Sequence, residues 1–463
     1  MRISLALLTA VVVAALTAPA AATADSGKTV STTFDAPRSG EALLTMRALA
    51  PGADWGEPGR ESAVVTVKVD GRYNQDVVLF HGDEPFDYQV LLGPLPEGRH
   101  TIEAAFSPAK SPAGARGAQI KALRASLAED GGDAGLVYRH SPIIYGRDLP
   151  EIPGQYENNY TDVPLLTYHE VTHDGAGNTV IEYTEIWSNE DGGTNTPALM
   201  ARWGRTTDIE WIYRVTLDPS GRVLSEYYQA PNHQTLPFTG ARLGEHPMLQ
   251  TGTSNNNMNQ VMDPAQASGY RFIPDPSQTL PPNRAREVVM DANPWSYQVM
   301  AKEMIREGKV ESPADPATPA MSDQRNYLWA EIDKDTSYPA PPASGTWVGT
   351  ALAVKLVGDN RWYTSNHDVP DWSIQRDIPA ATTIELPPGK TPADVEAVKA
   401  FAVPVARGGP VPAPAPADYR IDVTSINRGF FLDMAFLPGP SFLTWSGDAV
   451  LTPQHPEEII WQR

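Results

Sequence analysis

The sequence contains no cysteine at all. Disulfide bonds, thiol catalysis and zinc sites built on cysteine are therefore excluded, and packed cores must supply the stability. Positive charge is also scarce, because 36 Lys and Arg stand against 56 Asp and Glu, for a formal net charge of −20. Phosphate binding draws its affinity from clustered Lys and Arg, so we expect no nucleic-acid partner.

Several motifs are missing too. We find no Gly-x-Ser-x-Gly elbow, no phosphate-cradling loop and no dinucleotide fingerprint, which disfavours esterases and enzymes that use a nucleotide, flavin or haem. After the first residues, no segment approaches the roughly 20 apolar residues of a membrane-spanning helix. We therefore expect no transmembrane segment.

Residues 1–24 have the pattern of a cleavable secretory signal peptide. Arg2 is followed by an apolar stretch from Leu5 to Leu16, and Ala22-Thr23-Ala24 before Asp25 forms a small-x-small cleavage site. The sequence therefore predicts a secreted, extracellular protein.

The 44 prolines and 36 glycines are spread among short apolar runs, a pattern typical of many strands joined by turns. We expect a mainly all-β protein of tandem antiparallel β-sandwich or jelly-roll-like domains with a few short helices. A polar, Gly-rich joint at 129–135 and a Pro-rich stretch at 312–346 suggest the divisions. The predicted domains are the signal peptide 1–24, an N-terminal β-sandwich module 28–128, a central β domain 136–312 that carries the candidate site, and a C-terminal β domain 346–463.

Local patterns predict individual elements. In the N-terminal module the alternating run 62–69 ends in Asp70-Gly71, which is a strong hairpin signal. Short sequence segments of this module resemble those of accessory β-sandwich modules of exported enzymes, including carbohydrate-binding modules. Trp295 to Glu307 has the periodicity of an amphipathic helix. Central strands are expected at 142–145, 163–171, 179–187, 208–217 and 222–229.

Glu185 is the first candidate catalytic residue. Ile181, Tyr183, Glu185 and Trp187 share one face of the predicted strand 179–187, so this carboxyl group lies on an aromatic, inward side. Burial among aromatic rings raises the pKa of a carboxyl group, as a general acid requires. The alternative is a structural Glu185 held by an arginine such as Arg202 or Arg214.

Asp208 and Glu210 are the second pair of candidates. Strand periodicity puts them on one face with Ile212 and Arg214, about 6.6–7 Å apart at the backbone. Such a pair can share a divalent cation or flank a scissile bond. Alternatively this is an ordinary solvated face on which Arg214 neutralises Glu210. The opposite face is expected to be core: Ile209, Trp211, Tyr213 and Val215.

Further residues could complete a site. His233 follows a strand end, where loops often carry function. Asn256 belongs to the run 251–259 of amides and hydroxyls, which can bond sugar hydroxyls or supply oxygens to calcium. Trp187 and Trp203 could stack on sugar rings. His246 is the third candidate metal ligand beside Asp208 and Glu210, and the expected cation is Ca²⁺ or Mg²⁺.

Four segments within about residues 140–260 resemble, in their order along the chain, the necrosis-inducing-like secreted proteins and the related vacuolar sorting 62-like domains. These segments are 140–145, 181–187, Gly204 to Glu210 and 244–247. In that family a Gly-His-Arg-His-Asp-Trp-Glu motif helps to bind a divalent metal. Gly204, Asp208 and Glu210 match it in register, whereas Arg205 and Thr207 replace its histidines and Ile209 its tryptophan. The resemblance implies a β-sandwich with a cation at Asp208 and Glu210, and it does not transfer the family's membrane-damaging activity.

Three functions remain in competition. The first is a carbohydrate-active enzyme, a glycoside hydrolase that acts on an extracellular or cell-wall polysaccharide through Glu185 with Asp208 or Glu210. The others are a non-catalytic glycan-binding or matrix protein and a divalent-metal-binding, toxin-like β-sandwich protein. The enzyme hypothesis requires the three carboxyl groups to converge in one cleft lined by Trp or Tyr.

Overall fold

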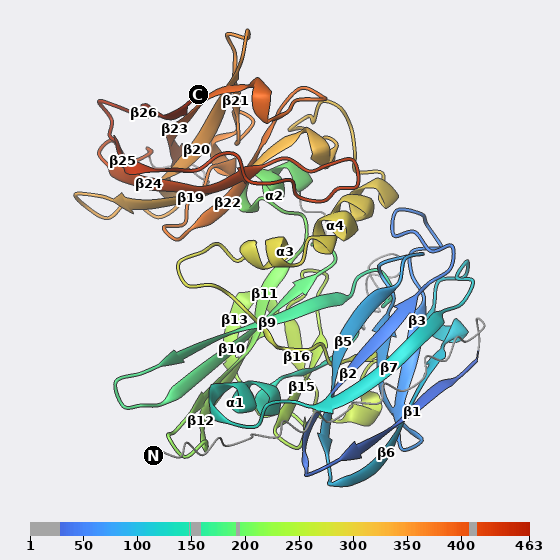
Figure 1. Cartoon of the computed structure of the whole chain (residues 1–463). Coiled ribbons are helices and arrows are strands. Elements are labelled where there is room, and N and C mark those ends of the chain that lie inside the picture. Colours follow the sequence, from blue (N-terminus) through green and yellow to red (C-terminus); the bar gives the residue numbers. More distant parts are fainter. Residues whose placement is uncertain (1–27, 148, 150–158, 191–194, 407–413) are drawn as a thin grey trace, which may run out of the picture.

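The computed structural model describes residues 28–147, 149, 159–190, 195–406 and 414–463, so the predicted signal peptide lies outside the described residues. Strands dominate the chain and the helices are few and short, which confirms the expected all-β class. Figure 1 shows the N-terminal strands beside a central layer of sheet, with the C-terminal strands above that layer. No helix in these ranges is long and apolar enough to cross a membrane.

The N-terminal module is a sandwich of a four-stranded sheet, ordered β1-β6-β3-β4, and a three-stranded sheet, ordered β5-β2-β7. Asp70 and Gly71 both have positive φ (51° and 75°), which confirms the predicted turn between β3 and β4. The strands are β1 (Val30–Ala36), β2 (Gly40–Leu49), β3 (Val64–Val69), β4 (Arg72–Val78), β5 (Phe86–Leu95), β6 (Gly98–Phe106) and β7 (Gln119–Leu127).

The central region is a second sandwich. A six-stranded sheet, ordered β13-β12-β11-β10-β9-β18, lies over a smaller sheet, ordered β14-β15-β8-β17, with β16 paired to β15. The strands are β8 (Ile143–Tyr145), β9 (Pro164–His173), β10 (Thr179–Trp187), β11 (Ile209–Leu217), β12 (Val223–Ala230), β13 (Gln234–Pro237), β14 (Arg242–Leu243), β15 (His246–Thr251), β16 (Met258–Gln260), β17 (Arg271–Phe272) and β18 (Gln278–Thr279).

A bulge interrupts β11 where it pairs with β10. Tyr183 lies opposite Tyr213, but Thr184 lies opposite Trp211, so Ile212 is the extra residue. Ile212 and Tyr213 are therefore both fully buried in the same core. Tyr213 and Val215 are core residues as expected, whereas Trp211, expected on the same face, is only partly buried and lies under Arg214 (4.8 Å).

The bulge also changes which charged residues face each other. Arg214 lies opposite Glu182, whereas Glu210 lies opposite Glu185. Because Glu182 and Glu185 are three residues apart on one strand, they point to opposite faces of the sheet. Arg214 and Glu210 are thereby separated, contrary to the prediction that they share a face.

Four α-helices occur in the described ranges: α1 (Gly132–His140), α2 (Thr196–Trp203), α3 (Val288–Ala292) and α4 (Trp295–Arg306). The predicted amphipathic helix is confirmed as α4. Helix α2 was not predicted from the sequence. Its start nevertheless has a recognisable signal: Asn195 Oδ1 accepts a hydrogen bond from Ala198 N (3.1 Å), and Pro197 follows within the first turn.

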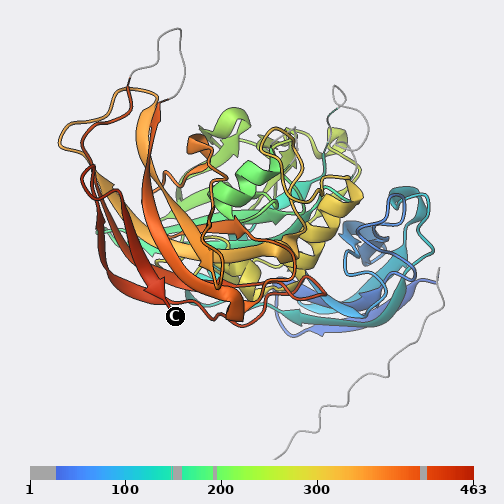
Figure 2. The same ribbon diagram turned by 90° about the horizontal axis from the view of Figure 1, so that it is seen from above.

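Helix α4 lies between the N-terminal and C-terminal sandwiches in both views (Figures 1 and 2). On one side the Trp55 indole donates a hydrogen bond to Glu303 of α4. On the other side Gln298 Nε2 donates to Ala435 O at 2.8 Å. The helix therefore connects the two outer sandwiches.

The C-terminal region is a third sandwich, with one sheet ordered β22-β19-β24-β25 and the other β21-β20-β23-β26. Strand β19 falls within the Pro-rich stretch 312–346 that suggested a domain division, and its Trp329 packs edge-on against Tyr297 of α4 (5.3 Å). The strands are β19 (Tyr327–Ser337), β20 (Thr346–Leu356), β21 (Trp362–Thr364), β22 (Ala380–Glu385), β23 (Val395–Ala406), β24 (Arg420–Phe430), β25 (Trp445–Leu451) and β26 (Glu457–Gln462).

The N-terminal sandwich is joined to the central one by backbone pairing as well as by side chains. Val90 of β5 forms an isolated bridge with Pro274, and Leu91 N donates to Ile273 O at 2.9 Å. The Gln75 side chain accepts a hydrogen bond from Ile273 N (3.1 Å). One continuous hydrophobic core spans both sandwiches, so they pack as one body.

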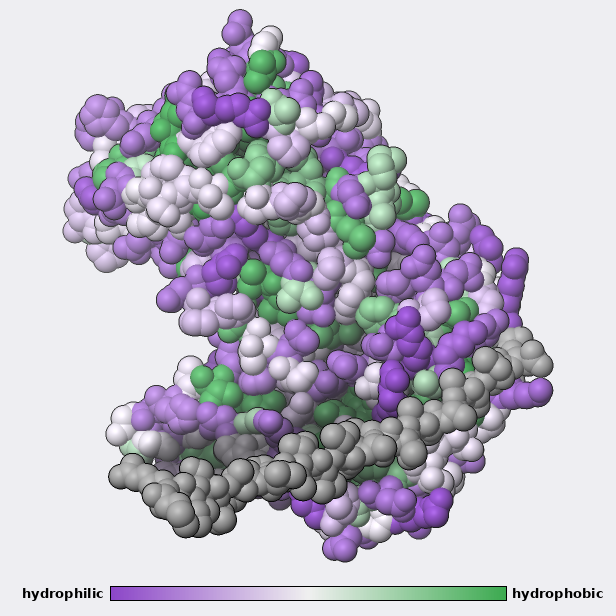
Figure 3. Space-filling view, viewed as in Figure 1, coloured by the Kyte–Doolittle hydropathy of each residue, from purple (hydrophilic) through white to green (hydrophobic). Residues whose placement is uncertain are grey.

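Figure 3 shows the hydropathy of one face of the molecule. On the face seen in Figure 3, hydrophilic side chains dominate and hydrophobic ones gather in small separate patches.

Gly204, at the C-terminus of α2, provides a test of how the central and C-terminal sandwiches meet. Its φ is +62°, and an added Cβ would lie 3.0 Å from both Ala381 Cβ and Thr382 N of the C-terminal sandwich. We expect Gly204→Ala to lower the free energy of unfolding by about 2 kcal/mol or more, because backbone strain of about 1–2 kcal/mol adds to this clash.

Gly358→Ala is the matched control, since Gly358 has φ +75° and no atom near the added Cβ. The Gly358→Ala variant should lose only the stability that corresponds to the backbone strain. The measurement is the thermal unfolding midpoint of both variants, and equal losses would contradict the close contact at Gly204.

Candidate functional site

Glu185 is fully buried on the inner face of β10. The Thr167 hydroxyl donates to one carboxyl oxygen, and Leu166 N donates to the other at 3.2 Å. Burial raises the pKa of Glu185 to about 8, and these two hydrogen bonds oppose the shift. The raised pKa confirms the prediction, whereas the proposed arginine partner was wrong, because Arg214 pairs with Glu182 (Nε to Oε2, 2.7 Å).

Asp208 is also buried, directly before β11. Burial raises its pKa well above the ordinary value, the carboxylates of Glu190 and Glu210 add to the shift, and Arg205 opposes it. Asn256 Nδ2 donates to Asp208 Oδ2 at 3.1 Å. Burial among other carboxylates therefore favours the protonated form of Asp208.

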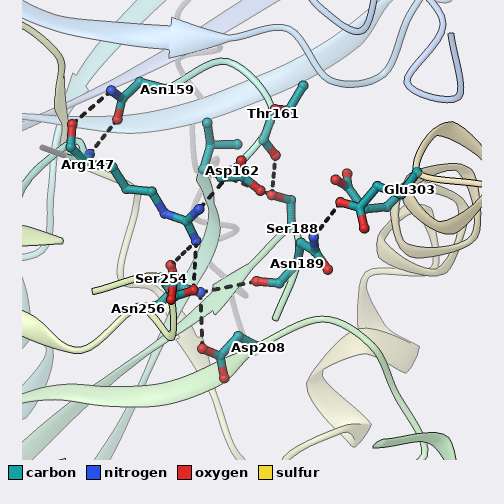
Figure 4. Close-up of polar contacts among 12 residues, drawn as sticks. Arg147, Asn159, Thr161, Asp162, Ser188, Asn189, Asp208, Ser254, Asn256 and Glu303 are labelled. Carbon is teal, nitrogen blue, oxygen red and sulfur yellow. Dashed lines mark hydrogen bonds and ion pairs between the residues drawn. The ribbon is translucent and has the colours of Figure 1, made fainter. Parts of the chain in front are cut away.

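The loop between β15 and β16 holds Asn256 against Asp208 (Figure 4). Arg147 Nη2 donates to Asn256 Oδ1 at 2.7 Å, and Asn256 donates to Asn189 O at 3.1 Å. Asn256 is fully buried. Its amide thus positions Asp208 and is closed to a sugar, unlike the substrate contact predicted for it.

Glu210 forms the outer end of this group. Gln229 Nε2 donates to its Oε2 at 2.8 Å, and His233 Nδ1 lies 3.7 Å from its Oε1. The His233 side chain is 53% exposed, and both Asn232 and His233 have positive φ. His233 therefore lies beside Glu210, and its role in substrate binding stays a prediction.

Glu190, Asp208 and Glu210 form what we call the acidic cluster. Arg205 lies beside it, with Nη1 3.7 Å from Glu190 Oε2 and Nε donating to Glu287 Oε1 at 3.1 Å. Across the described ranges no set of three or more His, Asp or Glu side chains is arranged to hold a metal ion. The Ca²⁺ or Mg²⁺ expected at Asp208 and Glu210 stays a prediction.

His246 lies apart from the acidic cluster. It begins β15, with Nδ1 2.8 Å from Ser141 O and Nε2 3.0 Å from Glu41 Oε2 of the N-terminal sandwich. The loop that contacts Asp208 follows the other end of the strand, roughly 17 Å away at 3.3 Å per residue. The structure therefore separates His246 from the two carboxylates with which it was grouped.

The two tryptophans proposed as sugar platforms differ. Trp187 is buried in the core, because β10 turns its ring inward, so this proposal needs correction. Trp203 is half-buried at the end of α2, with its ring close to several arginines. Because Glu185 and Asp208 are themselves buried, neither ring forms an open sugar-binding surface with them.

A pocket missed by the sequence analysis lies between the N-terminal and central sandwiches, and we call it the inter-module pocket. It encloses about 780 Å³ of empty space that is open to solvent. Strand β5, the start of β9, the segment 272–278 and the start of α4 all contribute. Its lining residues are Gln75, Asp76, Val77, Val78, Phe80, Phe86, Asp87, Tyr88, Gln89, Val90, Pro164, Leu165, Leu166, Phe272, Ile273, Pro274, Asp275, Ser277, Gln278, Asn293 and Trp295.

Aromatic rings form one wall of this pocket. Trp295 stacks on Phe80 with centroids 4.6 Å apart and meets Phe86 edge-on at 5.7 Å. Tyr88 contacts both phenylalanines at 5.2 and 5.0 Å. Phe86 and Trp295 are only partly buried, so they keep ring surface toward solvent.

Carboxylates and amides complete the lining. Asp87 Oδ2 lies 3.2 Å from Arg47 Nη1, while its Oδ1 is buried without a hydrogen-bond partner. Burial raises the pKa of Asp275. Asn293 Nδ2 donates to Gln278 Oε1 at 3.4 Å. The pocket thus combines aromatic surface with hydrogen-bonding groups.

No family model matches this chain. No curated protein matches it either. The resemblance to necrosis-inducing-like proteins therefore stays a prediction.

Parts of solved structures are similar to part of the chain. A CBM36-1 domain of a multidomain xylanase from the hindgut metagenome of Trinervitermes trinervoides is 22% identical over 23% of this chain and 75% of its own, with TM-score 0.17. A family 35 carbohydrate binding module from Clostridium thermocellum is 18% identical over 22% and 72%, with TM-score 0.17. A ruminal GH26 endo-beta-1,4-mannanase is 13% identical over 25% and 20%, with TM-score 0.18.

The buried carboxyl group of Glu185 predicts a pH dependence of stability. Folded protein keeps this group protonated up to about pH 8, whereas an unfolded chain ionises it near pH 4.5. The folded state thus holds the extra proton between these values, and its stability falls as pH rises, by at most about 1.4 kcal/mol per pH unit.

The Glu185→Gln variant cannot lose that proton. Its unfolding midpoint relative to the wild type should rise steadily from pH 5 to pH 8 in calorimetry. A difference that stays constant over this range would contradict the buried, protonated state.

Proposed function

We propose that this chain is a secreted glycan-binding protein and that the inter-module pocket is its binding site. The observation that carries the proposal is the combination of aromatic faces with carboxylate and amide groups in one open pocket. Sugar rings offer apolar C–H faces that stack on aromatic rings, and hydroxyls that both donate and accept hydrogen bonds. Concave sites with a few convergent polar groups are the usual form of ligand pockets.

Burial of the carboxyl groups favours binding over hydrolysis. A glycoside hydrolase needs two carboxyl groups on either side of the scissile bond, about 5–9.5 Å apart and within reach of the sugar. Glu185 and Asp208 are 0% and 1% exposed, so a polysaccharide cannot reach either of them. Of the three candidate catalytic residues, Glu210 alone keeps some exposure.

The expected mode of binding assigns roles to the lining residues. Trp295 and Phe86 offer their solvent-facing ring surfaces to a sugar ring. The Asp87 side chain, which is 42% exposed, is an acceptor for a sugar hydroxyl, and Gln89 and Gln278 also line the pocket. Each of these polar groups contributes more to the orientation of the bound sugar than to the affinity for it.

Binding should be measured on the mature protein by calorimetry against a panel of soluble polysaccharides. We expect Trp295→Ala to weaken binding at least ten-fold, about 1.4 kcal/mol, because the ring contributes stacking area. Asp87→Asn should weaken it by less, since the amide keeps an oxygen acceptor.

Trp362→Ala is the matched control, because Trp362 lies on the C-terminal sandwich under Lys399 (4.7 Å). It should bind like the wild type. If no polysaccharide binds, or if Trp295→Ala and Trp362→Ala behave alike while both stay folded, the proposal fails. Release of reducing ends from a bound polysaccharide would show hydrolysis instead.

A further inference from the structure

The charged groups that line the inter-module pocket are all acidic. Asp76, Asp87 and Asp275 contribute carboxylates, whereas no Lys, Arg or His among the described residues belongs to the lining. The other polar groups of the lining are amides and hydroxyls, which are neutral. A positive charge on a ligand is therefore attracted to this pocket, and a negative charge is repelled.

One of these carboxylates already has its cation. The Asp76 side chain is fully buried, and Lys110 Nζ lies 2.6 Å from its Oδ2. The Thr66 hydroxyl donates to Asp76 Oδ1 at 2.8 Å, and the Tyr73 hydroxyl donates to Oδ2 at 2.6 Å. Asp76 is thus a neutralised structural group, which leaves Asp87 and Asp275 to determine the charge of the pocket. We call these two the pocket carboxylates.

The pocket carboxylates are less well balanced. Asp87 Oδ2 lies 3.2 Å from Arg47 Nη1, but both side chains are 42% exposed, so water screens this ion pair. Asp275 accepts hydrogen bonds from Ser277 N (3.1 Å) and Ser277 Oγ (3.0 Å). In the part of the chain that the structure describes, no cationic side chain lies within ion-pair distance of Asp275. Its negative charge is therefore available to a cation from outside.

The pKa values of the neighbouring groups agree with this. Burial lowers the pKa of the nearby His169, which favours the neutral imidazole. Burial also raises the pKa of Asp275, and the hydrogen bonds from Ser277 oppose this shift. A cation held in the pocket would lower the pKa of Asp275 again, because an adjacent positive charge favours the ionised carboxylate.

Backbone pairing brings the pocket carboxylates to the same part of the pocket. Strand β5 faces the central sheet (Figure 1), and its Val90 forms an antiparallel bridge with Pro274. Asp275, one residue after Pro274, therefore comes opposite Gln89, one residue before Val90. Asp87 and Gln89 lie on the same side of β5, roughly 7 Å apart at the backbone. Both carboxylates thus border one part of the pocket, with Gln89 between them.

The aromatic wall adds to the attraction for a cation. Phe86 directly precedes Asp87, and both Phe86 and Trp295 keep ring surface toward solvent. The face of an aromatic ring is negative, so it attracts a cation, most strongly when the ring is a tryptophan. A sugar that carries an ammonium group would use the ring faces for stacking and the carboxylates for its charge.

From this arrangement we infer that the glycan bound by the inter-module pocket is an amino-sugar chain with free amino groups. One ammonium group lies between Asp87 and Asp275, and its sugar ring stacks on Trp295. This inference rests on the proposed function, because it names the class of glycan for that same site. An N-acetylated or neutral sugar stacks on the same rings but brings no cation to the carboxylates. A uronic acid adds a further negative charge and is repelled.

The test compares three oligosaccharides of equal length and identical linkage, made of glucosamine, N-acetylglucosamine or glucose, which differ in one substituent of each ring. The protein without residues 1–24 is titrated by calorimetry at constant ionic strength and at about pH 6, where such amines are protonated. We expect the glucosamine oligomer to bind about five-fold more tightly, or better, than either neutral oligomer.

Equal or tighter binding of a neutral oligomer would overturn the inference and leave the proposed function standing. The inference is also overturned if none of the three oligomers binds, and the panel of polysaccharides then decides the proposed function separately. An oligolysine of matched charge is the competitor. We expect it not to displace the glucosamine oligomer, and displacement would show that the pocket selects charge without the sugar.

Two variants assign the preference to the pocket carboxylates. Asp275→Asn and Asp87→Asn should each lower the ratio of glucosamine to N-acetylglucosamine affinity to about two-fold or less, since each removes one negative charge. Asp448→Asn is the matched control, because Asp448 is exposed on β25 of the C-terminal sandwich. It removes the same charge from the chain and should keep the full preference. Equal losses in Asp275→Asn and Asp448→Asn would assign the attraction to the net charge of −20 and overturn the inference.

Discussion

The pairing of β5 with the segment 272–274 is the contact on which the rest of this molecule depends. Val90 and Pro274 form the bridge, and Leu91 N donates to Ile273 O. Backbone hydrogen bonds between two sandwiches fix their relative position more strictly than apolar packing alone, because they are directional. The aromatic end of β5 is thereby held beside the start of α4, and the inter-module pocket forms between them.

A second constraint is the bulge at Ile212. It adds one residue to β11, so that Glu210 lies opposite Glu185 and Arg214 is moved to the other face, against Glu182. Without it, Arg214 would face the acidic side and neutralise it. The bulge therefore lets the acidic cluster gather around the start of β11, with Asp208 buried and Arg205 as a counter-charge.

Local sequence patterns predicted much of the fold but little of the candidate site. The Asp70-Gly71 turn, the strand 179–187 and the helix at 295 could be predicted because each depends on neighbours in sequence. The bulge could not, since Ile212 and Tyr213 are both apolar and either fits a core position. The full extent of strand β19 could not be predicted from the Pro-rich stretch 312–346, because its pairing partners β22 and β24 come later in the chain.

The candidate residues divide in the same way. Glu185, Asp208, Glu210 and His233 were found from strand periodicity and loop position, and the structure places them around the start of β11. Residue type alone grouped three further residues with them: His246, Trp187 and Asn256. In the folded protein each of the three makes structural contacts in place of the predicted ligand contact. The inter-module pocket required segments some 200 residues apart to meet, although the alternating aromatic and polar residues from Phe86 to Gln89 were a visible signal.

The central claim concerns where a glycan binds, and hydrogen–deuterium exchange tests it most directly. The protein without residues 1–24 is compared with and without a saturating amount of the oligosaccharide that binds it best. Our account predicts slower exchange in 86–90 and 272–278, and no change in the loop 253–257 or in the C-terminal sandwich. Protection centred on the loop 253–257 and His233, with 86–90 unaffected, would contradict it and would move the binding site to the acidic cluster.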